Sequence, residues 1–179
     1  DRRQRQMCIR DSGYIASGKT HDFEDLVSSA DHIIFGLYPT ALIEWFRTYG
    51  HLLKPGCIFT DVSGVKTGLV EPVQAMCPAG VEFIASHPMA GKERSGFDAS
   101  EASLFYNASY ILVPGEAPQS ATDTLVSLAK SMGFGTIKYC TQQKHDRMIA
   151  YTSQIPHVLA CAYVMSPRCD AVSYTHLRA

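Results

Sequence analysis

The 179-residue chain lacks the sequence features of several large protein classes. Its formal net charge is −1 and no run of like charges exceeds a few residues, so no surface for nucleic acid or anionic lipid is indicated. No apolar stretch is long enough to span a bilayer. The six cysteines form no C-x-x-C pair, and no metal site is predicted. These absences favour a reduced, cytoplasmic protein whose partner is a small molecule.

The chain also lacks the Gly-rich turn G-x-G-x-x-G, which holds the phosphates of a dinucleotide at the start of a helix. The nearest glycine pair, Gly133 and Gly135, precedes a predicted strand instead. Two interpretations stay open: the chain binds no dinucleotide, or its first βαβ unit lies upstream of Ser12. Residues 1–12 and 172–179 show neither a helical nor a strand period and resemble translated adapter sequence, so we expect both ends to be non-native.

Strands and helices alternate from residue 31 onward. Short runs rich in β-branched and aromatic residues predict strands at 31–37, 57–61, 81–86, 109–113 and 135–140. Helices are predicted between them at 40–53, 65–76 and 120–132. This alternation is typical of the α/β class with a Rossmann-like, mostly parallel sheet. We expect residues 13–140 to form a partial dinucleotide-binding domain that lacks its first βαβ unit.

A long helical run then follows over residues 141–165, with Thr141 as its N-cap and no later strand. It predicts the start of an all-helical domain at 141–171. Pro156 has no N–H for the carbonyl four residues earlier, so we expect a kink in this helix. At about 100° per residue, Asp146, Ser153 and His157 are expected on one face. A polar stripe among apolar residues needs a partner or a function.

Three loops directly follow predicted strands: "LYPT" at 37–40, "DVSG" at 61–64 and "HPMAG" at 87–91. Ligands of open α/β sheets bind outside the carboxyl ends of the strands, so these loops should converge on one crevice. His87 would then lie at this crevice. The alternative, a histidine that only ends a strand within the fold, stays open at this point.

At these residues the chain resembles the prephenate dehydrogenase family. The segments "TDVSGVK" (60–66), "HPMAGKERSGF" (87–97) and "HDRMIAYTSQIPH" (145–157) lie in the family's order and spacing, within a resemblance that covers about residues 13–165. The resemblance implies oxidative decarboxylation of prephenate, or of arogenate, in tyrosine biosynthesis. It also implies NAD or NADP as cofactor, a Rossmann domain joined to a helical dimerisation domain, and a homodimer at full length.

The resemblance further implies roles for individual residues. His87 would bind the ring hydroxyl of the substrate as general base, and His157 would contact the substrate from the helical domain. The implied catalytic residues are His87, His157 and Ser63, and the implied cofactor-binding residues are Leu37, Tyr38, Pro39, Asp61, Val62, Gly64, Pro88 and Met89. One departure concerns the serine, because the family pattern Asp-x-x-Ser-Val-Lys has Gly64 in the serine position here and Ser63 one residue earlier.

Two other functions stay open from the sequence. A β-hydroxyacid-type Rossmann dehydrogenase would use a catalytic lysine in the helical domain, where Lys144 lies one turn early. A non-catalytic fragment that binds an aromatic metabolite is the second. We expect the 179-residue chain alone to be inactive. In a complete enzyme, turnover should fall as His87 is protonated, near a pKa of about 6.5 unless burial shifts it.

Overall fold

The computed structural model describes residues 18, 19, 21–92 and 99–167. The ends predicted to be non-native therefore lie outside the described residues. Five strands form a single sheet in chain order: β1 (His32–Phe35), β2 (Ile58–Asp61), β3 (Glu82–Pro88), β4 (Ser109–Val113) and β5 (Thr136–Tyr139). Each strand lies within one residue or two of a predicted one. The α/β, mostly parallel architecture predicted from the sequence is confirmed.

One pair of neighbours runs in the opposite sense to the others. Strands β1, β2 and β3 are parallel and β5 is parallel to β4, but β4 is antiparallel to β3. Parallel neighbours are normally joined by a crossover helix. The described part of the link between β3 and β4 holds only the short 3₁₀ helix η3 (Ala102–Phe105). The chain therefore returns along the sheet in the opposite direction, and the described part of the link contains no crossover helix.

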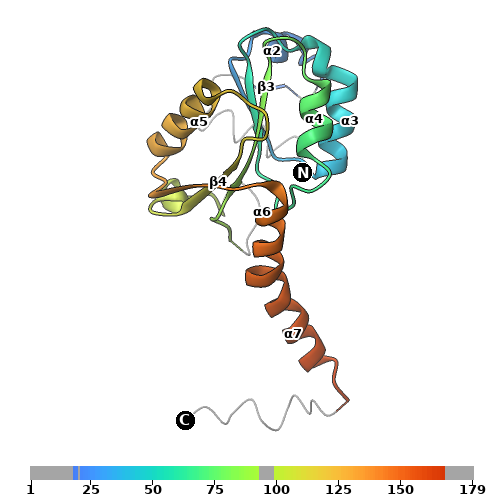
Figure 1. Cartoon of the computed structure of the whole chain (residues 1–179), viewed down its shortest axis with the longest axis vertical. Coiled ribbons are helices and arrows are strands. Elements are labelled where there is room, and N and C mark those ends of the chain that lie inside the picture. Colours follow the sequence, from blue (N-terminus) through green and yellow to red (C-terminus); the bar gives the residue numbers. More distant parts are fainter. Residues whose placement is uncertain (1–17, 20, 93–98, 168–179) are drawn as a thin grey trace.

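Helices cover both faces of the sheet (Figure 1). One face carries α3 (Pro39–Tyr49) and α4 (Val70–Met76), with α2 (Glu24–Ser29) and the 3₁₀ helix η1 (Gly50–Leu52) at its end, and the other carries α5 (Gln119–Ser131). Beneath α3, the phenyl ring of Phe59 stacks between those of Phe46 and Phe83, at centroid distances of 5.0 and 4.8 Å. Two hydrophobic cores therefore form, one on each side of the sheet.

Two local signals explain where the helices of this region begin. Pro39 is the first residue of α3, a position that needs no N–H donor and suits the fixed φ of proline. The predicted helix at 65–76 is shorter than expected, because Gly68 has a φ of +78° and α4 begins only at Val70. A left-handed residue cannot continue a right-handed helix.

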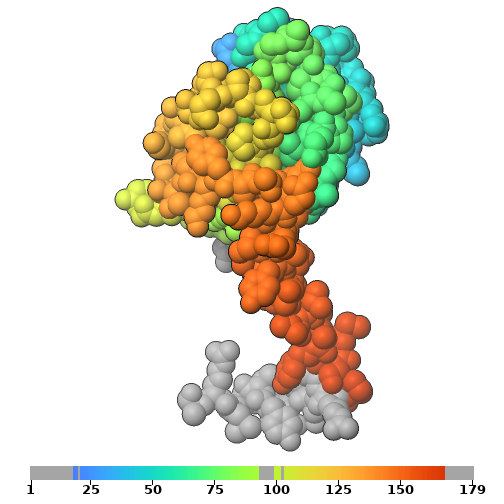
Figure 2. Space-filling model, in the orientation of Figure 1, coloured from blue at the N-terminus to red at the C-terminus, as the bar shows by residue number. Residues whose placement is uncertain are grey.

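The remaining helices leave the sheet as an arm (Figures 1 and 2). The arm consists of α6 (Gln142–Ile149), the π-helical turn η4 (Ala150–Gln154) and α7 (Ile155–Val164). Thr141 caps α6 as predicted, accepting a hydrogen bond from the Lys144 amide at 3.3 Å. Every residue of α7 is exposed. In the part of the chain that the structure describes, no helix has the length and apolar character needed to cross a membrane.

The π turn changes which residues share a face of this arm. A π turn holds more residues than an α turn, so an advance of 100° per residue does not apply across 150–154. Asp146 binds the loop after β2, Ser153 is half-buried and His157 is exposed on α7. The three side chains that were expected to form a polar stripe therefore do not share one environment in the structure. The irregularity itself was expected, since Pro156 follows the π turn.

Candidate active site

Two of the three segments predicted as strand-end loops come into direct contact in the structure. Strands β1 and β2 end in register, with Phe35 opposite Asp61, and Asp61 pairs with Ala85 of β3, which continues to Pro88. A side chain added at Gly64 would have its Cβ 3.8 Å from Cε1 and 4.0 Å from Nε2 of His87. The loop after β2 therefore meets the end of β3 at the His87 ring. His87 and Pro88, which the sequence placed in the loop after the strand, are the last two residues of β3 and pair with β4.

A buried ion pair holds these two segments together. Lys66 Nζ lies 2.6 Å from Asp61 Oδ2, and both side chains are 0% exposed. Lys66 also donates to the Ser86 carbonyl at 2.6 Å, while the Ser86 amide donates to Asp61 Oδ1 at 3.1 Å. Burial lowers the pKa of Lys66, and the Asp61 carboxylate opposes this shift. Because each charge is paired and hydrogen-bonded, the arrangement fixes the "DVSG" loop against β3.

The hydroxyl of Ser63 is directed into its own loop. It donates a short hydrogen bond to the Asp61 carboxylate and lies 3.0 Å from the Val65 carbonyl. Gly64, the position of the family's serine, adjoins the His87 ring. The catalytic role of Ser63 stays a prediction, and the structure shows that its hydroxyl already has partners within the loop.

The half-buried His87 ring is part of a hydrogen-bonded chain of side chains. Its Nδ1 lies 2.9 Å from Nε2 of His145, and Nδ1 of His145 lies 2.7 Å from Oδ1 of Asp146. His145 is only 1% exposed. Burial is the largest cause that lowers the pKa of His87 to about 4, and its neighbours His145 and Lys66 lower it further. The ring is therefore neutral near neutral pH, as a general base must be.

Asp146 at the end of this chain is held by backbone amides. Lys66 N–H donates to its Oδ1 at 2.9 Å and Thr67 N–H to its Oδ2 at 2.7 Å. Burial raises the pKa of Asp146, but the hydrogen bonds from Thr67 and His145 outweigh it and hold the pKa below its ordinary value. Asp146 is therefore a carboxylate that can only accept hydrogen bonds.

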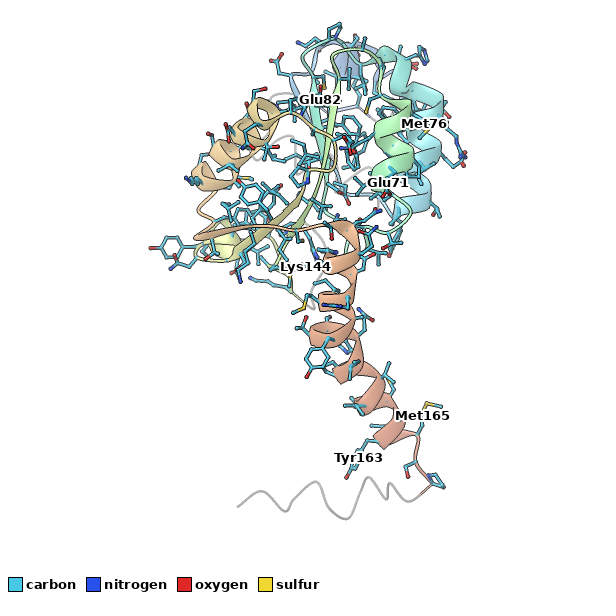
Figure 3. The ribbon with its side chains drawn as sticks, in the orientation of Figure 1. Glu71, Met76, Glu82, Lys144, Tyr163 and Met165 are labelled. Atoms are coloured by element: carbon cyan, nitrogen blue, oxygen red, sulfur yellow. The ribbon has the colours of Figure 1, made fainter. Side chains whose placement is uncertain are left out.

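The first turns of α6 present one polar face to the rest of the fold. Gln142 donates to Glu71 of α4, which Figure 3 shows close to the beginning of α6. With His145 and Asp146 it forms an i, i+3, i+4 set, which lies on one face of a helix. Sequence reasoning did not assign a role to His145. The sequence did contain a signal for His145, because the same helical spacing continues to Ile149. Gln142, His145 and Ile149 are the buried residues of α6.

The residues predicted to bind cofactor fall into three groups by exposure. Tyr38, Val62 and Met89 are large apolar side chains that stay exposed on the three neighbouring strand-end loops. Asp61 is fully buried in the ion pair, so its side chain offers no surface to a ligand. The others are half-buried or lack a side chain: Leu37, Pro39, Pro88 and Gly64. The structure tests none of these assignments, and they stay predictions.

Comparison with known proteins identifies the family. Residues 10–137 match the family model described as the nucleotide-binding domain of prephenate dehydrogenase. The chain belongs to the prephenate dehydrogenase family. The cyclohexadienyl dehydrogenase of Zymomonas mobilis is 31% identical over 142 residues, which are 79% of this chain and 48% of that protein.

Solved structures of the family share the fold. The arogenate dehydrogenase of Synechocystis is 30% identical and superposes with a TM-score of 0.70, over 82% of this chain and 53% of that one. The prephenate dehydrogenase of A. aeolicus, solved with hydroxyphenyl propionate and NAD+, is 23% identical with a TM-score of 0.80, over 92% and 56%. The chain spans about half the length of these relatives.

The family match bears on the alternatives that the sequence left open. Because the matched model is a nucleotide-binding domain, it speaks against the interpretation that this sheet binds no dinucleotide. It also favours the prephenate dehydrogenase assignment over a β-hydroxyacid-type enzyme. The lysine that the latter would need, Lys144, is exposed on the first turn of α6 (Figure 3).

Proposed function

We propose that the protein catalyses the NAD(P)-dependent oxidative decarboxylation of prephenate, or of arogenate, in tyrosine biosynthesis. One observation carries this proposal within the matched family. His87 is neutral, lies at the carboxyl end of a parallel strand, and has its Nδ1 occupied by His145, so that Nε2 remains for a substrate. A general base needs this combination of position and protonation state.

The chemistry requires little more than orientation and one base. Loss of a hydride and of CO2 from prephenate produces an aromatic ring, so much of the driving force lies in the substrate. A bound nicotinamide cofactor supplies the hydride acceptor. His87 Nε2 accepts the hydrogen bond of the ring hydroxyl, and it takes up the proton as the oxygen becomes carbonyl-like. The Lys66–Asp61 pair keeps the neighbouring loop in place while this occurs.

Three exposed apolar side chains support the placement of the cofactor. Tyr38, Val62 and Met89 are exposed and follow the ends of β1, β2 and β3, the edge of the sheet at which His87 lies. A relative of the same fold was crystallised with NAD+. The relatives carry the names cyclohexadienyl, arogenate and prephenate dehydrogenase, so their names do not select one substrate. A homodimer and a cytoplasmic location stay predictions.

Replacement of His87 by Asn tests the proposal. The variant is made in a full-length protein that contains this sequence and is as long as its relatives. The rate of NADH formation from prephenate is then measured. Asn keeps a polar side chain but cannot take up a proton, so we expect kcat to fall by about 10²–10⁴. The Kd for NAD should be nearly unchanged, because His87 binds no part of the cofactor in this scheme. A variant that keeps most of its kcat would contradict the proposal.

His157→Ala separates the second histidine from the first. If His157 contacts the substrate, its loss raises the KM for prephenate more than the KM for NAD. An equal rise of both would assign His157 to packing of the helical part. A wild-type protein that binds prephenate without forming NADH would instead favour the non-catalytic alternative.

A further inference from the structure

We propose that His145 and Asp146 are positioning residues, which together hold His87 in the tautomer with a proton on Nδ1 and a lone pair on Nε2. This inference rests on the proposed function only for the role of the Nε2 lone pair, which is to accept the hydrogen bond of the substrate's ring hydroxyl. The tautomer itself follows from the geometry of the three side chains and is measurable without turnover.

At Asp146 the direction of each hydrogen bond is determined. Its carboxylate receives two backbone N–H groups, from Lys66 at 2.9 Å and from Thr67 at 2.7 Å. A carboxylate with these donors has no proton to give, so the His145 nitrogen 2.7 Å from Oδ1 must carry one. Nδ1 of His145 is therefore an N–H donor.

The tautomer of His145 then determines that of His87. A neutral imidazole with a proton on Nδ1 has a lone pair on Nε2. Since His145 Nε2 lies 2.9 Å from His87 Nδ1, the hydrogen bond between them requires the proton on His87 Nδ1. Nε2 of His87 is left as an acceptor, on the side of the ring that adjoins Gly64.

A charged His145 would produce the opposite arrangement, with His87 Nε2 protonated. The side chain of His145 is only 1% exposed. The charged groups around the His87 ring are Lys66, Asp61 and Asp146. Lys66 and Asp61 neutralise each other in their ion pair. Asp146 favours either form of its neighbour that keeps a proton on Nδ1, so the experiment must separate the neutral from the charged form.

The arrangement also links catalysis to the helical arm. His87 lies on β3, whereas both residues that orient it lie on α6. A proton taken up at His87 Nε2 is stabilised through His145 by the Asp146 carboxylate, whose pKa is already held low. The position of α6 on the sheet therefore controls whether the base presents its lone pair.

The direct test is nitrogen NMR of isotope-labelled histidine in the 179-residue chain at neutral pH. The His87 signals are assigned by their loss in His87→Gln. We expect a protonated Nδ1 and an unprotonated Nε2 on His87. In Asp146→Asn, the amide can donate to His145 Nδ1, so we expect the His87 proton to shift toward Nε2. A wild-type His87 protonated on Nε2, or an Asp146→Asn spectrum identical to wild type, would overturn the proposal.

A kinetic test uses two matched changes at His145 in a full-length protein. Gln reaches as far as the imidazole and accepts the bond from His87 Nδ1, whereas Leu has similar volume and no acceptor. We expect His145→Gln to keep kcat within about tenfold and His145→Leu to lose about 10²–10⁴. In a Ser-His-Asp triad, the Asp→Asn change lowers kcat about 10⁴-fold because the wrong tautomer forms. Equal losses for Gln and Leu, with equal thermal stability, would contradict the positioning role.

The two tests separate this inference from the proposed function. If the wild-type protein forms no NADH but His87 shows the expected tautomer, the proposed function fails and the positioning role of His145 and Asp146 stands. If the protein turns over prephenate but His87 Nε2 is protonated, the proposed reaction stands, while the positioning role and the acceptor role of His87 Nε2 both fail.

Discussion

Helix α3, which packs on the sheet, and helix α7 both contain apolar segments, yet only α3 buries any of its side chains. Leu42 on α3 is 0% exposed, while Leu159 on α7 is 64% exposed. The segment "IPHVLACAYV" of α7 has no charged residue and still buries none of its side chains. Figure 3 shows Tyr163 and Met165 at the far end of this arm, away from the sheet. Apolar composition therefore indicates that a segment needs a surface to pack against, but it does not show that the fold provides this surface.

Helix α6 differs from both α3 and α7, because hydrogen bonds from its polar side chains attach it to the sheet region. Its contacts to the sheet region are polar and directional: Gln142 to Glu71, His145 to His87, and Asp146 to two backbone amides. Directional contacts specify a position more sharply than apolar contacts do. The part of the arm nearest the sheet is thus oriented by the groups of the candidate site. Substitutions in the sheet region, at the candidate site and in α7 are therefore expected to differ in their effects on stability.

The largest effect is expected when the buried ion pair of the sheet is broken. Lys66→Met removes one partner and leaves Asp61 as an uncompensated buried charge, which costs about 3–5 kcal/mol in free energy of unfolding. Urea denaturation measures this change. The control is Lys54→Met, since Lys54 pairs with Asp31 at 2.6 Å on the surface and should matter little. Similar losses for both variants would show that burial does not distinguish the two pairs.

The second prediction makes the same substitution in both regions. Leu42→Ala deletes a fully buried side chain and leaves a cavity, so the free energy of unfolding should fall by about 2–5 kcal/mol. Leu159→Ala removes an exposed side chain, and we expect a change within about 0.5 kcal/mol. If Leu159→Ala is as costly as Leu42→Ala in the purified chain, α7 is covered in solution and the contrast between the regions does not hold.

The third prediction concerns the acid sensitivity of the site between sheet and arm. Burial and the neighbouring His145 and Lys66 lower the pKa of His87 to about 4, against about 6.5 in an unfolded chain. Asp61 and Asp146 oppose the shift. Between these two pH values the unfolded state binds a proton that the folded state does not. The free energy of unfolding therefore decreases as the pH falls from about 6.5 to about 4.

The size of this pH effect is limited by solvent. The ring of His87 is only half-buried, so screening reduces the contribution to about 1–2 kcal/mol. Denaturation at a series of pH values measures it. His87→Gln should flatten the profile over this window, whereas His51→Gln, at an exposed position, should leave it unchanged. A profile that His87→Gln does not alter would mean that another group titrates.

The smallest effect is expected from Gly64→Ser, which supplies the hydroxyl that the family pattern has at this position. The added Cβ would lie 3.8 Å from the His87 ring, an ordinary contact. Stability should change by no more than about 0.5 kcal/mol. One added hydrogen bond contributes about 0.5–1.5 kcal/mol, so kcat in a full-length protein should rise by roughly two- to tenfold. A fall in kcat would indicate that the site requires glycine at position 64 and does not tolerate the added side chain.

Much of this arrangement was predictable because it depends on short-range patterns. Pro39 begins α3 and Thr141 caps α6, as their local sequence indicates. The parallel order of β1, β2 and β3 places the loops after them at one edge, which was enough to find His87. The antiparallel β4 was missed, because strand direction depends on how the link between β3 and β4 folds back. The π turn was expected only as a kink at Pro156.

By itself the sequence determined the α/β class, the elements, the strand-end loops and the family motifs, since these follow from periods and turn residues within a few positions. Only the tertiary structure decided the partners within the site. His87 meets His145 across 58 residues, and Asp146 meets the Lys66 amide across 80. Such contacts depend on the packing of α6 against the loops of two strands, and no local period encodes that packing. The protonation and tautomer of His87 depend on these long-range neighbours, because burial and hydrogen-bond direction control both.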